Sequence, residues 1–154
     1  MTTVTVGQAV APFTAMTNHG EITLASLQGK QLVIYFYPKD NTPGCTTQAQ
    51  GFRDLYQEFQ DAGCQIIGVS RDSVKSHENF AAKQQIPFPL IADTDEAVCQ
   101  LFDVIKMKNM YGKQVRGIAR STFLIDAAGV LQQEWRGIRV PGHVDAVLQA
   151  VRDQ

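Results

Sequence analysis

The sequence has no large surplus of either charge and no long hydrophobic run. Its 154 residues include 14 basic and 15 acidic side chains, which gives a formal net charge of -1. The sequence therefore has no surplus of basic residues to bind nucleic acid and no polybasic segment to bind a membrane surface. No apolar run approaches the about 20 residues of a membrane-spanning helix, and the N-terminus lacks the features of a signal peptide. We therefore expect a cytoplasmic protein that binds neither nucleic acid nor membrane.

Cysteine is scarce, and its spacing excludes two common uses. The three cysteines are an odd number, which argues against a framework of structural disulfides. Cys45 and Cys64 are 19 positions apart, and no C-x-x-C or H-x-x-x-H spacing typical of zinc sites occurs. The sequence thus predicts no metal and no cofactor, and in a reducing compartment it leaves the cysteines as thiols or as redox-active groups.

The remaining pattern is that of one α/β domain spanning residues 1–154, without linkers or repeats. Three buried strands, expected at 32–38, 65–70 and 90–93, alternate with helices. A β-hairpin of strands 13–16 and 21–24 precedes them, and a second hairpin of strands 121–126 and 129–135 follows, before a final helix. Strands joined through helices lie parallel with right-handed crossovers. We therefore predict a thioredoxin-like fold, with a mixed central sheet, helices on both faces and an N-terminal β-hairpin.

One segment has no clear pattern. Residues 103–119 carry Lys106, Lys108, Lys113 and Arg116. A solvated basic loop is the favoured interpretation, and a binding patch is the alternative.

The stretch from Leu32 to Asp61 places one cysteine at the start of a helix. A buried strand from Leu32 to Pro38 is followed by a loop rich in Asn, Pro and Gly, and apolar positions three or four apart then predict a helix from Thr46 to Asp61. Cys45 lies at this junction, where free backbone N–H groups and the helix dipole favour the nucleophilic thiolate.

The helix end alone is too weak to ionise the thiol fully. Taking a thiol from about 3 % to about 90 % ionised at neutral pH needs about 3.4 kcal/mol, whereas a helix terminus contributes about 0.3–1 kcal/mol. The hypothesis therefore requires a nearby cation, as well as a sulfur that solvent can reach.

The residues around Cys45 resemble the active site of a known family. The spacing Pro38-x-x-x-Thr42-x-x-Cys45 is similar to the peroxiredoxin motif, and the string FYPKDNTPGCTTQA resembles the bacterioferritin-comigratory, or peroxiredoxin Q, branch. The segments VGQAVAPF, STFLIDAAGVL and PGHVDAVL extend this resemblance over nearly the whole chain. It implies a thioredoxin-like fold and a monomer that reduces hydrogen peroxide and organic hydroperoxides, with thioredoxin, glutaredoxin or a small thiol as reductant.

The resemblance also implies roles for four residues. Cys45 would attack the peroxide and become a sulfenic acid. Arg120, just before the strand at 121–126, would be the missing cation, and Thr42 would hold the peroxide in line. Pro38 would wall the pocket. A surface arginine, a turn threonine and a strand-ending proline are the alternatives.

The sequence departs from the branch where a resolving cysteine is often found. Position 50 is Gln50, no cysteine lies between Gln65 and Val98, and Gln48 replaces a frequent acid. A helix of about 17 residues would hold Cys64 about 25 Å from Cys45, whereas a disulfide needs Cα atoms within about 7 Å. A one-cysteine cycle with an external thiol is favoured, and Cys99 stays open as a resolving thiol.

Three other functions compete with the peroxidase. A thioredoxin-type dithiol oxidoreductase needs a Cys-x-x-Cys that Cys45 lacks. A cysteine hydrolase needs a base such as His77 or His143 beside the thiol. A non-enzymatic peroxide sensor, whose Cys45 signals by oxidation, is the main alternative.

Overall fold

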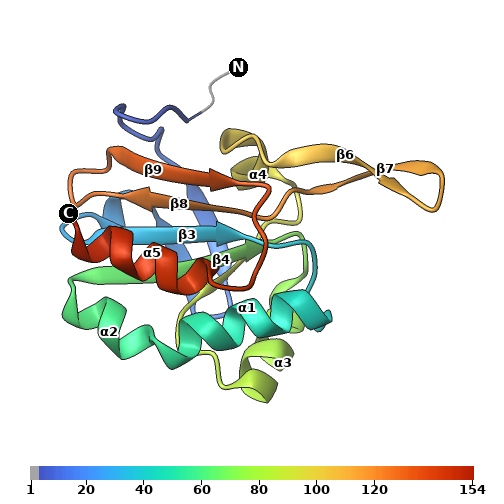
Figure 1. Ribbon diagram of the computed structural model, residues 1–154, viewed down its shortest axis with the longest axis horizontal. Coiled ribbons are helices and arrows are strands. Elements are labelled where there is room, and N and C mark those ends of the chain that lie inside the picture. The colour runs from blue at the N-terminus through green and yellow to red at the C-terminus, as the bar shows by residue number, and fades with distance from the viewer. Residues whose placement is uncertain (1–3) are drawn as a thin grey trace.

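A central mixed sheet organises the computed structural model, which describes residues 4–154, Met110 by its backbone alone (Figure 1). The strand order is β2-β1-β5-β4-β3-β8-β9. The strands are β1 (Thr14–Thr17), β2 (Gly20–Thr23), β3 (Gln31–Phe36), β4 (Cys64–Ser70), β5 (Leu90–Ala92), β8 (Ser121–Ile125) and β9 (Leu131–Arg136). This is the predicted mixed sheet, with both predicted hairpins, β1–β2 and β8–β9, at its two ends.

The middle of the sheet follows from the apolar run of β3. Its side chains from Leu32 to Phe36 are buried, which suits a strand covered on both faces. It pairs in parallel with β4 and antiparallel with β8, where Phe36 lies opposite Ser121. Consequently the chain leaves β3 at the same edge of the sheet at which it enters β8.

Helices cover both faces, but unequally. They are α1 (Pro43–Asp54), α2 (Tyr56–Asp61), α3 (Val74–Gln84), α4 (Ala97–Leu101) and α5 (His143–Arg152), with a 3₁₀ turn, η1 (Ala25–Leu27). Residues from α1, α2, α3 and α5 share one core cluster, while α4 and η1 contribute to a second, on the opposite side of β3. Residues 4–154 contain no helix that could serve as a membrane span.

The prediction of a single helix over residues 46–61 is wrong in one respect. The structure has two helices there, separated at Leu55. The backbone of this residue has φ -102° and ψ 7°, and it separates α1 from α2. Phe52 and Phe59 are nevertheless both fully buried. The apolar spacing is therefore continuous across the break, which explains why the sequence pattern does not reveal it.

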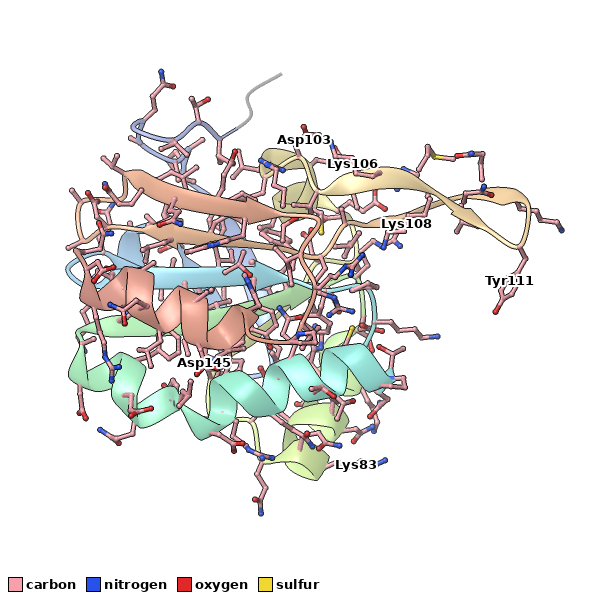
Figure 2. The ribbon with its side chains drawn as sticks, viewed as in Figure 1. Lys83, Asp103, Lys106, Lys108, Tyr111 and Asp145 are labelled. Carbon is pink, nitrogen blue, oxygen red and sulfur yellow. The ribbon has the colours of Figure 1, made fainter. Side chains whose placement is uncertain are left out.

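The prediction of a loop over residues 103–119 is also wrong. This segment forms a hairpin of β6 (Ile105–Met110) and β7 (Lys113–Ile118), which is a separate two-stranded sheet and projects from the body (Figure 1). Tyr111 and Gly112 both have positive φ, 52° and 77°, as a tight two-residue hairpin turn requires. Figure 2 shows Tyr111 at the tip. Because most of the hairpin packs on no core, its sequence carries no hydrophobic signal.

Helix α4 begins at Ala97 and is capped by a residue that precedes it. The Asp93 carboxylate accepts hydrogen bonds from the backbone N–H groups of Val98 and Cys99. Asp93 therefore caps the helix from four residues before its first residue.

Candidate active site

The turn from β3 into α1 places Cys45 in the first turn of the helix. Thr42 is the N-cap, with an extended backbone (φ -91°, ψ 152°), and Pro43 takes the first helical position, where a missing N–H costs nothing. Cys45 is thus the third residue of the helix, within the turn whose backbone N–H groups are free, as predicted. Cys45 is only 2 % exposed, less than the sequence hypothesis expects of a reactive thiol.

Arg120 reaches the sulfur. The pairing of β3 with β8 brings the residue before Ser121 to the edge where β3 ends. Both Nη1 and Nη2 of Arg120 lie 3.5 Å from Sγ of Cys45. The absence of a side chain on Gly44 permits this approach, since a Cβ there would lie 3.3 Å from Nη2. The predicted cation is therefore beside the predicted nucleophile.

Gln48 orients the guanidinium. It follows Cys45 by three positions on α1 and therefore shares its face. Nη1 of Arg120 donates a hydrogen bond of 2.7 Å to Oε1 of Gln48. Within residues 4–154, no carboxylate lies within ion-pair distance of Arg120. The positive charge of Arg120 is therefore not neutralised by a carboxylate and acts on the sulfur. The sequence interpretation missed that Gln48 holds the guanidinium in this position.

Thr42 and Pro38 lie in the same loop. The Thr42 hydroxyl donates to the backbone carbonyl of Lys39 at 2.8 Å, which leaves its oxygen lone pairs free to accept a hydrogen bond. Pro38 lies two residues after the end of β3 and is half-buried. Neither side chain has a hydrogen bond to the Cys45 sulfur, so their roles at the peroxide stay predictions.

The two other thiols are buried away from this site. Cys64 lies opposite Gln31, at the far end of β3 from Cys45, and burial raises the pKa of its thiol to about 12. Cys99 belongs to the second core cluster, whereas Cys45 belongs to the first. Burial and the nearby Asp93 raise the pKa of the Cys99 thiol. Neither group is a nucleophile at neutral pH.

The histidines that a hydrolase would need are bonded elsewhere. His77 contacts Asp40 and the carbonyl of Ile91. His143 contacts the Thr122 hydroxyl at 2.8 Å, and burial, together with Arg120, lowers its pKa to about 4. Neither ring has a hydrogen bond to Cys45 among the described contacts, so the site lacks the base of a cysteine hydrolase.

An open groove of about 560 Å³ runs beside Cys45, between α1 and α5. It is lined by Pro43, Gly44, Thr47, Gly51, Val140, Pro141, Gly142, Val144 and Asp145. All but two of these side chains are apolar or absent, so the groove suits an apolar group. Gly44, the residue before Cys45, is part of its lining.

Comparison with known proteins identifies the family. The AhpC/TSA family profile matches residues 6–134. The chain belongs to the AhpC/TSA family. Peroxiredoxin Bcp of Xanthomonas campestris is 61 % identical over 132 residues, covering 86 % of this chain and 82 % of that protein. Peroxiredoxin Bcp of Bacillus subtilis is 45 % identical over 152 residues, covering 98 % and 97 %.

Solved structures agree with this assignment. A peroxiredoxin Q variant of Xylella fastidiosa superposes with a TM-score of 0.93 at 41 % identity, covering 99 % of this chain and 98 % of that one. The X. campestris bacterioferritin comigratory protein, described for its alkyl peroxide reduction activity, gives 0.87 at 56 % identity, covering 92 % and 90 %. The resemblance to the peroxiredoxin Q branch, the thioredoxin-like fold and the thiol peroxidase class predicted from the sequence are thereby confirmed.

Proposed function

We propose that this peroxiredoxin reduces hydrogen peroxide and organic hydroperoxides through Cys45. The observation that carries the proposal is the Arg120 guanidinium on the Cys45 sulfur at the start of α1. A cation and a helix N-terminus together stabilise the thiolate, and the thiolate is the form that attacks.

In the proposed reaction, the thiolate attacks one oxygen of the peroxide and the O–O bond breaks. The electron pair of that bond leaves with the second oxygen, which takes a proton and departs as water or an alcohol. Cys45 becomes a sulfenic acid. Arg120 stays charged and has several donors, so it can stabilise both the thiolate and the developing charge on oxygen. Thr42, whose hydroxyl hydrogen is engaged with Lys39, would accept a hydrogen bond from the peroxide.

The groove between α1 and α5 supports the organic substrates. Its largely apolar lining includes Pro43 and Gly44, the two residues before Cys45, so an alkyl group could lie in it while the peroxide meets the sulfur. The alkyl peroxide reduction described for the X. campestris relative agrees with this substrate class.

An external thiol would restore the enzyme. It would attack the sulfenic sulfur, release water and form a mixed disulfide, which a second thiol would then reduce. Thioredoxin, glutaredoxin or a small thiol could serve. Resolution by Cys99 is less favoured because the two cysteines belong to core clusters on opposite faces of the sheet. The monomeric state and the cytoplasmic location stay predictions.

Turnover distinguishes the enzyme from a peroxide sensor. We expect wild-type protein to consume many equivalents of peroxide when a thiol reductant is supplied. Cys45→Ser should abolish this activity and Cys64→Ser should retain it. One stoichiometric oxidation without turnover would favour the sensor, and full activity in Cys45→Ser would refute the assignment.

Mass spectrometry after one equivalent of peroxide tests the resolving step. A persistent sulfenic acid at Cys45 would support the one-cysteine cycle. A Cys45–Cys99 disulfide would show that Cys99 resolves instead.

A further inference from the structure

A buried polar cluster lies behind the active-site loop and has no part in the chemistry described above. The Asp40 carboxylate is its centre. One oxygen accepts from the Tyr37 hydroxyl at 2.6 Å. The other lies 2.8 Å from the Ser76 hydroxyl and 2.7 Å from Nδ1 of His77. Both Asp40 and His77 are buried, His77 with no exposed surface at all.

The hydrogen bonds show how the His77 ring is oriented toward Asp40. Nε2 of His77 lies 2.8 Å from the backbone carbonyl of Ile91, which only accepts, so Nε2 carries a proton. A second proton lies between Nδ1 and the Asp40 carboxylate. Burial and the nearby carboxylate raise the pKa of Tyr37, so its hydroxyl also remains a donor. Donors from Tyr37, Ser76 and His77 therefore converge on the Asp40 carboxyl group.

Asp72 completes the cluster but does not make it a metal site. Oδ2 of Asp72 accepts from the backbone N–H of Asp40 at 2.9 Å and from the Ser70 hydroxyl at 2.5 Å. Atoms of Asp40, Asp72 and His77 lie within 4.8 Å of one another. Each of these three groups already has protein hydrogen-bond partners, so a hydrogen-bond network accounts for the cluster without a cation.

The cluster ties the active-site loop to a different part of the chain. Asp40 lies between Pro38 and Thr42, while Ser76 and His77 lie on α3. The backbone of the next residue, Asn41, has φ +64°, an uncommon left-handed conformation that surrounding contacts must hold. The Asp40 contacts hold the residue before Asn41 in place, because the backbone N–H and the carboxyl group of Asp40 are both hydrogen-bonded.

We propose that Asp40 and His77 are positioning residues, which hold the loop so that Thr42 and the start of α1 meet the peroxide correctly. The pair touches neither sulfur nor substrate and acts through the backbone of residues 38–42. This inference rests on the proposed function, since it assigns a second set of residues to the same reaction.

The test compares two reactions of the same sulfur. Oxidation of Cys45 by hydrogen peroxide requires the aligned loop, whereas alkylation by iodoacetamide requires only an accessible thiolate. Asp40→Asn keeps the shape of the side chain and removes its charge. We expect its single-turnover rate constant with peroxide to fall about tenfold, because a small misplacement of reacting groups is costly. The alkylation rate, measured on its high-pH plateau, should stay equal or rise.

Two further variants keep the result interpretable. Ser76→Ala removes one donor to Asp40 with little effect on α3, and it should show a smaller loss in the same selective pattern. Asp126→Asn makes the same chemical change in the β8–β9 turn, where the carboxylate accepts from the backbone N–H groups of Ala128 and Val130, and it should alter neither rate.

Each outcome decides the proposal. A selective loss of the peroxide reaction in Asp40→Asn supports it. Unchanged rates, or equal losses in both reactions together with a lower melting temperature, would overturn it and leave a purely structural pair. If wild-type Cys45 itself resists peroxide, the proposed function fails, which this comparison reveals separately.

Discussion

At the scale of single residues, the site is built from one sulfur, one cation and one amide. Arg120 contacts Cys45 with two nitrogens and Gln48 with one. Gln48 is fully buried, and its Nε2 has no hydrogen-bond partner among the described residues. An amide at this position orients the guanidinium without neutralising it, whereas a carboxylate would also compete with the thiolate for the cation.

Gln48→Glu tests this difference. A carboxylate beside Arg120 should disfavour the Cys45 thiolate and move the midpoint of the alkylation pH profile up by about one unit. Iodoacetamide alkylation followed from acid to alkaline pH measures that midpoint. Gln50→Glu is the matched control, since it makes the same change on the same helix at a side chain bonded to Gln84. Equal shifts of the midpoint in both variants would mean that the contact between Gln48 and Arg120 does not affect the ionisation of Cys45.

At the scale of helices and strands, α1 and α5 pack closely beside the site. Gly51 on α1 faces Val144 on α5, and a Cβ at Gly51 would lie 3.1 Å from a methyl group of Val144. The two helices also form the walls of the groove beside Cys45. A larger side chain at Gly51 would therefore push the helices apart.

Gly51→Val should destabilise the protein by about 1–3 kcal/mol through overpacking. Denaturant unfolding at neutral pH measures the loss. The double variant Gly51→Val, Val144→Ala should recover part of it, because the smaller partner makes room. A double variant that is less stable than the sum of the two single changes would contradict close packing at this point.

Much of this arrangement could be predicted from the sequence, and the exceptions have physical reasons. The apolar run of β3 and the Pro- and Gly-rich loop after it locate Cys45, and pairing of β3 with the strand after Arg120 brings the cation to it. The Asp40–His77 pair could not be foreseen, because the two residues are 37 positions apart and meet only in the folded chain. The β6–β7 hairpin was missed because it packs largely outside the core.

At the scale of the whole molecule, a buried histidine near the site couples stability to pH. His143 is neutral in the folded protein, where burial and Arg120 lower its pKa to about 4. In the unfolded chain it would titrate near its ordinary value of about 6.5. Between these values the unfolded state binds more protons, so stability is complete above pH 6.5 and is lost as the pH falls toward 4.

The expected slope from this one group is at most about 1.4 kcal/mol per pH unit. Denaturant unfolding at pH 7 and pH 5 should show a smaller loss of stability for His143→Asn than for wild type. Parallel losses in the two proteins would mean that His143 does not titrate on unfolding in this range.

Rapid mixing of wild type and Arg120→Ala with hydrogen peroxide, across a range of pH, measures whether Arg120 prepares the Cys45 thiolate to break an O–O bond. We predict that the variant oxidises Cys45 at least about a hundredfold more slowly at neutral pH, with the midpoint of its pH–rate profile a unit or more higher. Equal rates and equal profiles in the two proteins would show that Arg120 does not activate the sulfur.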